Sequence, residues 1–276
     1  MRKIWAVAKR EFKSYFITPT GYVVAGAYAA ITGVGFAASF IVHARTTLRP
    51  SMHGLEGVPD LEETFLSPFL VFCGQLLLLM GPLITMRLLA EERSRGTLEL
   101  LLTYPLRDRD IIFGKFVAAL GMVLVLMLIV GAHLTIMFHF TTVEPAVLWF
   151  GLFGVFLMSA VIISIGMFVS AVTRNQITAA VVTFAALFIS YVLGTFGESL
   201  PEQVAMPPSL PETIEPAFNA GYSLVRQVVV ELPLDSHVQE MAIGIAQVSD
   251  IVYYLVFTAF FLFLTFRALE SRRWRA

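Results

Sequence analysis

Apolar residues in this chain gather in long runs that charged residues rarely interrupt. Five uncharged runs reach the roughly 20 residues that an α-helix needs to cross a bilayer. A sixth run, Ile251–Phe266, reaches that length only if its helix begins earlier and carries Asp250 in its outer part. The pattern therefore predicts an all-α polytopic membrane protein with six transmembrane helices, at about residues 22–42, 66–87, 114–140, 145–173, 175–197 and 245–267.

Composition supports a membrane protein, and the distribution of charge predicts its orientation. Hydrophobic residues make up 57% of the chain and charged residues 14%, which argues against a soluble domain. With the N-terminus inside, 16 of the 19 Lys and Arg residues fall on that side and 3 on the other. Because cytoplasmic loops retain Lys and Arg, both termini are expected in the cytoplasm. A cleavable signal peptide is not expected, since the first run is too long and further spans follow it.

The first 18 residues have the pattern of an interfacial helix. Trp5 and Phe12 fall on an apolar stripe with helical spacing, while Arg10 and Lys13 lie mostly on other faces. This pattern predicts a basic amphipathic helix in the inner headgroup layer. The alternative is an ordinary positively charged flank of the first span. Breaking residues around Pro19 then turn the chain into the membrane.

Two connections are expected on the outer side. The connection over residues 43–64 has Pro and Gly signals without clear periodicity, so an irregular loop is expected there. In the region 198–244, an acidic, proline-rich part precedes apolar residues at helical spacing from Phe218 to Leu232. This second part predicts either a short external or re-entrant helix that caps the spans, or an amphipathic helix on the outer surface.

The segment over residues 88–113 is the most charged part of the chain. Retention on the cytoplasmic side needs only a few Lys or Arg residues, whereas this segment also contains five acids, which contribute little to topology. Gly96 predicts a bend or a new helix start, and Pro105 predicts a helix end. Mixed charge on short, proline-punctuated helices indicates a docking surface for a cytosolic partner.

The residues of this segment carry a family resemblance. The stretch "RLLAEERSRGTLELLLTYPLRDRDIIFGKF" resembles the segment after the second span in membrane subunits of type-two ATP-binding cassette (ABC) export systems, especially the permease associated with bacterial gliding motility. The stretch "KREFKSYFITPTGYVV" is similar to the basic helix and proline turn of the same subfamily. The matching positions in the first stretch are Glu91, Glu92, Arg93, Gly96, Thr97, Leu98, Glu99, Pro105, Gly114 and Lys115.

The resemblance implies one transporter membrane domain over residues 1–276, in a bacterial cytoplasmic membrane. Two copies, or one copy and a related permease subunit, would enclose a path for export through the lipid bilayer. A cytosolic ATPase, which would hold ATP and Mg, would dock on a coupling helix in the segment 88–113. The residues implied to contact that ATPase are Glu91, Glu92, Arg93, Gly96, Thr97, Leu98, Glu99, Leu102 and Pro105.

Other chemistry finds little support in the sequence. The chain has no G-x-x-x-x-G-K-[ST] loop for nucleotide phosphates and no H-E-x-x-H motif, and Cys73 is its only cysteine. An intramembrane enzyme that uses His133, His139 and Asp250 stays an alternative, as does a membrane anchor for a cytosolic complex. No nucleic-acid partner and no cofactor of the chain itself are expected.

Three polar residues within the predicted spans are candidates for a path or for contacts inside the bundle: Gln75, His133 and Asp250. Asp250 is expected either in the headgroup layer or paired with an external base such as Arg226. The transported substrate stays open among lipid, polysaccharide, peptide and drug-like cargo.

Overall fold

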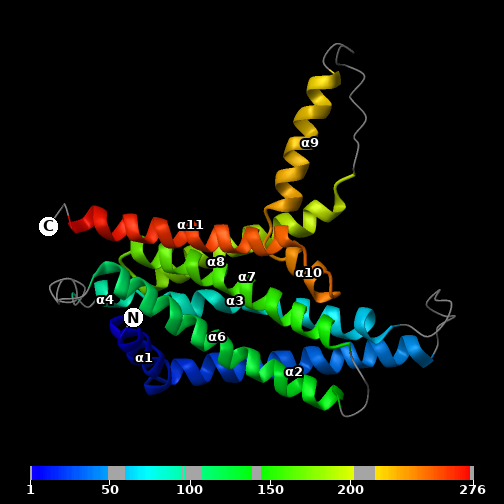
Figure 1. Cartoon of the computed structure of the whole chain (residues 1–276), viewed down its shortest axis with the longest axis horizontal. Helices are drawn as coiled ribbons and strands as arrows, with labels where there is room; N and C mark the ends of the chain where they lie inside the picture. The colour runs from blue at the N-terminus through cyan, green and yellow to red at the C-terminus, as the bar shows by residue number, and fades with distance from the viewer. Residues whose placement is uncertain are drawn as a thin grey trace.

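The described part of the protein is almost entirely helical. The computed structural model describes residues 2–48, 60–94, 96, 107–138, 144–201 and 215–273, and no strand occurs among them. Six helical stretches are long and apolar enough to cross a membrane, which confirms the predicted six spans. Figure 1 shows them side by side along the long axis of the molecule. Their helices are α2 (Pro19–Leu48), α3 (Ser67–Thr85), α6 (Asp108–Phe138), α7 (Pro145–Val172), α8 (Gln176–Ser199) and α11 (Val248–Arg273).

Shorter helices complete the two ends of the bundle. They are α1 (Arg2–Ile17), η2 (Glu62–Leu66, a π-helical segment), α4 (Ala90–Ser94), α9 (Glu215–Glu231) and α10 (Ser236–Ala242). The start of α1, α4 and the C-terminal end of α11 lie at one end, which we call the basic end (Figure 1). Both termini therefore lie at the same end of the bundle. Which side of the membrane this end faces stays a prediction from the Lys and Arg distribution.

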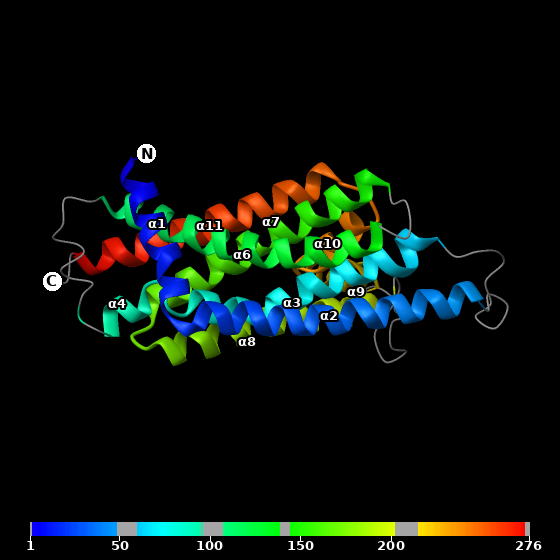
Figure 2. The ribbon, with the colours of Figure 1, turned by 90° about the horizontal axis from the view of Figure 1, so that it is seen from below.

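The N-terminal helix and the long outer region contain helices where periodicity predicts them. In Figure 2, α1 runs across the bundle rather than along it, and the chain turns at Thr18 into α2. Helix α9 ends at Glu231, just before Pro233, and projects sideways from the bundle (Figure 1). It does not cover the spans, which favours the surface-helix alternative.

The irregular loop expected over residues 43–64 is wrong for the residues described on each side of it. Helix α2 continues to Leu48, and η2 precedes α3. The hydroxyls of Thr46 and Thr47 each donate to the His43 carbonyl at 2.8 Å, which keeps this polar extension helical. The His43 ring lies 2.7 Å from the Thr64 hydroxyl through its Nδ1 atom, so the extended α2 is tied to η2.

Helices α3 and α7 form the core of the bundle. Of the most apolar window of each span, 67% of the residues are buried in the α3 span and 72% in α7, against 17% in α2 and α11 and 22% in α8. The two core helices meet where glycines allow close approach, and we call this contact the α3–α7 seam. A Cβ atom on Gly166 would overlap the Thr85 side chain, and one on Gly81 would overlap Ile162. Small residues permit such packing where the hydrophobic effect between lipid-facing helices is weak.

The α3–α7 seam leads to a prediction for Gly166. A Gly166→Ala substitution should lower the stability of the protein by about 1–3 kcal/mol, because the added methyl group forces Thr85 or the helices to shift. Thermal unfolding of the purified protein in detergent, followed by size-exclusion chromatography, measures this loss. Gly131→Ala in α6 is the matched control, because a Cβ atom there meets nothing within 4 Å. Equal midpoints for the two variants would contradict a tightly packed seam.

Candidate functional site

A group of four charged residues joins three helices at the basic end. We call Arg10, Glu11, Glu92 and Lys115 the basic-end cluster. The Lys115 Nζ atom lies 3.2 Å from Glu11 Oε2 of α1 and 3.0 Å from Glu92 Oε1 of α4. The Arg10 guanidinium lies 2.9 Å from Glu11 and 3.8 Å from Glu92. Two acids balance two bases, so α1, α4 and α6 meet around a pairing without net charge.

Burial makes this pairing necessary. The Lys115 side chain is only 1% exposed, and a buried charge without a partner is costly. Gly114 lets α1 approach α6 here, since a Cβ atom on it would lie 2.7 Å from the Val7 Cβ atom. Although burial by itself raises the pKa of the Glu11 carboxyl, Lys115 and Arg10 hold this pKa below the ordinary value of 4.5. The stabilisation by Glu11 is thus present at neutral pH and lost as the pH falls through the lowered pKa.

A second contact ties the start of α2 to the end of α3. The Arg87 guanidinium donates from Nε to Glu91 Oε2 at 2.7 Å. Its Nη1 atom donates to the hydroxyls of Thr18 and Thr20, at 3.0 and 2.6 Å. Because Thr18 forms the turn between α1 and α2, Arg87 connects this turn to the segment that leads into α4.

A third contact attaches α4 to the end of α7. The Ser170 hydroxyl accepts from the backbone N–H groups of Leu89 and Ala90, at 3.0 and 2.9 Å. The Arg93 Nη1 atom donates to the carbonyls of Val172 and Thr173, both at 3.0 Å. These carbonyls lie at the negative end of the α7 dipole, where a cation is favourable. The contacts that connect α4 to α1, α6 and α7 therefore all lie between Leu89 and Arg93.

The residues predicted to contact an ATPase divide into two groups. Glu91, Glu92 and Arg93 have partners within the chain, so their polar groups fix α4 in place. Gly96 has a φ of 67°, a left-handed conformation typical of a helix end, which confirms the predicted break. The other predicted contacts lie outside the described residues: Thr97, Leu98, Glu99, Leu102 and Pro105.

Sequence reasoning missed Glu11, Arg87 and Ser170 as site residues, and took Lys115 only as a family match. Lys115 did carry a signal, since it is a lone cation directly before an apolar run and therefore needs a buried partner. The partners themselves lie far away in the sequence, and no local pattern marks them.

The residues predicted for the interfacial helix point in different directions. Trp5 is 67% exposed, as a residue at a membrane surface would be. Phe12 packs on α6, where a Cβ atom on Gly121 would lie 3.1 Å from its ring. Arg10 belongs to the basic-end cluster, and Lys13 is exposed. Helix α1 thus packs on the bundle through one side and exposes the other.

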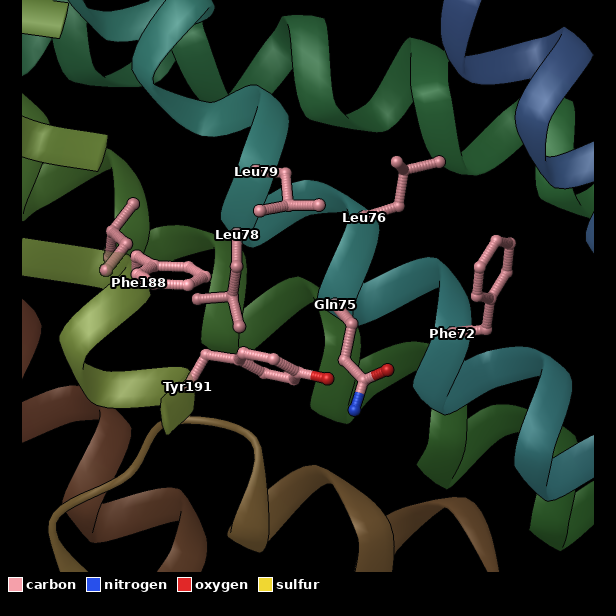
Figure 3. Close-up of a pocket in the computed structure, with 8 residues that line it drawn as sticks. Phe72, Gln75, Leu76, Leu78, Leu79, Phe188 and Tyr191 are labelled. Carbon is pink, nitrogen blue, oxygen red and sulfur yellow. The ribbon is translucent and has the colours of Figure 1, made fainter. Parts of the chain in front are cut away.

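Gln75 lines a pocket between α3 and α8. Figure 3 shows the pocket, with the Tyr191 hydroxyl directed towards the Gln75 amide. The cavity volume is about 260 Å³, and apart from these two polar groups its lining is apolar. The lining residues are Phe72, Gln75, Leu76, Leu78, Leu79, Leu187, Phe188 and Tyr191.

Asp250 lies at the start of α11 and pairs with His237, so the expected partner Arg226 is wrong. The Asp250 Oδ1 atom lies 2.9 Å from His237 Nδ1, and the residue is 4% exposed. The other ring nitrogen of His237 lies 3.1 Å from the Glu231 carbonyl at the end of α9. Nearby, Tyr254 donates to the Leu234 carbonyl at 2.6 Å. These contacts hold the end of α9, helix α10 and the start of α11 together around the buried Asp250.

The described residues give little support to an intramembrane enzyme. Among the described residues, the His133 ring forms a hydrogen bond only within its own helix, with Nδ1 2.8 Å from the Ile129 carbonyl. Its ring packs against Phe36 and Phe69, as expected for a histidine inside the bundle. Asp250 contacts a different set of helices, and His139 lies outside the described residues. No group of His, Cys, Asp and Glu among the described residues could hold a metal ion.

Comparison with known proteins gives one family match. The profile of the family described as ABC-2 family transporter protein matches residues 6–273 of this chain. A search of curated proteins returned no match. The family match extends over almost all of the chain and includes every described helix that enters the basic-end cluster.

The basic-end cluster predicts a large effect for the loss of Lys115. A Lys115→Met variant should be destabilised by about 3 kcal/mol, because Glu11 and Glu92 lose their buried partner. Adding Glu11→Gln and Glu92→Gln should restore part of that loss. The readout is the midpoint of thermal unfolding in detergent. Arg267→Met is the control, because the Arg267–Glu270 pair is exposed and such pairs contribute about 0–1 kcal/mol. Similar losses in both single variants would contradict a structural role for the cluster.

Proposed function

The chain belongs to the ABC-2 transporter family, and from this premise we propose that it is the permease of an exporter in the bacterial cytoplasmic membrane. Membership makes it the membrane-spanning, non-catalytic subunit of an ABC transporter, which associates with an ATP-binding subunit. The proposal adds that this ATPase is a separate cytosolic subunit that binds ATP and Mg. It also adds the export direction, for which the resemblance to the gliding-motility-associated subfamily is the support.

The observation that carries the proposal is the attachment of α4 to helices on every side. In the proposed mechanism, the ATPase binds the coupling segment that follows Gly96 and displaces this segment when ATP binds to the ATPase. Because Glu92 is paired with Lys115, and Arg93 with the end of α7, α4 cannot move without moving α6 and α7. Arg87 carries the same displacement to the start of α2. The contacts thus convert a push at one short helix into a tilt of several spans.

The core packing supports a path between two copies rather than through one. Side chains fill the α3–α7 seam, as the close contacts at Gly81 and Gly166 show, so cargo does not pass there. The α3–α8 pocket instead lies beside α8, whose side chains are mostly exposed. A second copy or a related permease packed against this side would enclose the pocket. Its apolar lining with one amide and one phenol would accept an apolar or amphipathic group.

Membrane orientation follows from the same proposal. The basic end faces the cytoplasm, because it holds α1, α4 and the start of α6, where Lys and Arg are concentrated. The ATPase then has access to residues 97–106. Glu91, Glu92 and Arg93 position the coupling segment, while Glu99 and the leucines beyond Gly96 make the contacts with the ATPase.

Docking can be separated from folding by two charge reversals at the basic end. A Glu99→Lys variant should lose the co-purifying ATPase while the permease remains folded, because the contacts described for α4 are made by residues up to Arg93. The tagged permease is extracted gently from its native membrane, and mass spectrometry identifies the proteins that co-purify. Size-exclusion chromatography checks that each variant remains folded.

Glu270→Lys in α11 is the matched control, since Glu270 is 53% exposed and lies at the same end. It should retain the ATPase. If no nucleotide-binding subunit accompanies the intact wild type, the transporter assignment loses its partner and the membrane-anchor alternative gains support. If Glu99→Lys retains a fully coupled ATPase, the docking role of residues 97–106 is wrong.

A further inference from the structure

A second cluster of positive charge lies where α1 and α6 begin. A pocket of about 390 Å³ is lined there by two residues of α1 and three around the first turn of α6, which we call the α1–α6 basic pocket: Arg2, Lys3, Arg107, Arg109 and Asp110. Four of the five lining side chains are positive and one is negative. Asp110 is 9% exposed and its Oδ2 atom accepts from the Arg107 backbone N–H group at 3.3 Å. The Asp110 carboxylate therefore pairs in part with a backbone N–H group at the start of α6.

The helix directions add to the positive potential of the pocket. Gly114 of α6 lies against Ile4 and Val7, and Gly121 lies against Phe12, so the two helices begin side by side. Both N-termini thus adjoin the α1–α6 basic pocket, and a helix N-terminus presents backbone N–H groups and a partial positive charge. Four cationic side chains combined with two helix starts suit the negatively charged, non-bridging oxygens of a phosphate group.

The position of the pocket relative to the membrane surface indicates the kind of phosphate group that it binds. Helix α1 runs across the bundle (Figure 2), and Trp5, one turn from Arg2, is 67% exposed. Exposed Trp beside Arg and Lys is typical of the boundary between acyl chains and headgroups. The pocket therefore lies at headgroup depth, within reach of a lipid that approaches from the side.

We propose that the α1–α6 basic pocket binds the phosphate of an anionic phospholipid headgroup. Basic pockets between membrane helices on the cytoplasmic side bind such headgroups in other proteins. This site lies apart from the basic-end cluster, and its residues have no part in the docking of an ATPase as proposed above. A bound headgroup would hold the start of α1 against the start of α6, beside the end of the coupling segment.

Trp5 provides a direct readout of this site. In a Trp149→Phe/Trp274→Phe background, Trp5 is the only tryptophan. The protein is reconstituted in phosphatidylcholine bilayers that contain a small fixed fraction of either brominated phosphatidylglycerol or brominated phosphatidylcholine. Bromine quenches tryptophan only at short range. Brominated phosphatidylglycerol should quench Trp5 more strongly, which would show that the anionic lipid collects at this site.

Two independent variants test the pocket, one from each helix. Arg107→Gln/Arg109→Gln should reduce the preference for phosphatidylglycerol by about tenfold or more, as expected when two basic side chains near an anionic surface are removed. Arg2→Gln/Lys3→Gln should act in the same direction. The matched control, Lys9→Gln/Arg267→Gln, removes two positive charges at the same end but outside the pocket and should keep the preference.

Three results would overturn the proposal. Equal quenching by the two brominated lipids would show that the pocket selects no anionic headgroup. Loss of the preference in the control variant would assign it to general surface charge. Loss of the preference when inorganic phosphate is added at constant ionic strength would make free phosphate the ligand in place of a lipid.

Discussion

Lys115 keeps its positive charge away from water only while Glu11 and Glu92 remain within about 3 Å of it. In a medium of low polarity, separation from these carboxylates would leave a charge without compensation, so the three side chains act as one unit. Helices α1, α4 and α6 must therefore meet at one point, and α1 must cross the bundle to reach it. The turn at Thr18 and the Arg87 contacts follow from this requirement, because α2 has to start where α1 ends.

The rest of the bundle is built around close helix contacts rather than charge. Glycines on α3 and α7 bring the two core helices together, and the Ser170 hydroxyl of α7 attaches α4 to this pair through the N–H groups of Leu89 and Ala90. Because the α3–α7 seam is closely packed, a displacement of one core helix is transmitted to the other. The two helices are therefore expected to move together. In the proposed mechanism, α4 then moves together with the helices attached to it. No opening forms between the helices of one copy.

Much of the fold follows from the sequence, because a bilayer imposes a minimum length on every span. The six spans, the N-terminal helix, the end of α9 before Pro233 and the turn at Gly96 are all set by local patterns. Asp250 shows where local patterns fail. A buried acid needs a partner, and the formal base Arg226 was the natural choice, yet the partner is His237, which formal charge counts as neutral. The contacts of the coupling segment are also beyond prediction from this sequence, because they depend on the surface of another chain.

The position of Lys115 in the chain has a consequence for biosynthesis. Glu11 and Glu92 both precede it, so both carboxylates are synthesised before α6 enters the membrane. Tyr28 is in the opposite situation, because the Cys73 carbonyl that accepts its hydroxyl at 3.3 Å is made only later. Helix α2 is thus made before the acceptor of its Tyr28 hydroxyl, whereas α6 is made after both of its counter-charges. Insertion of the third span is therefore the step at which the ribosome has supplied all four members of the basic-end cluster, while the α7 partners of α4 are still to be made.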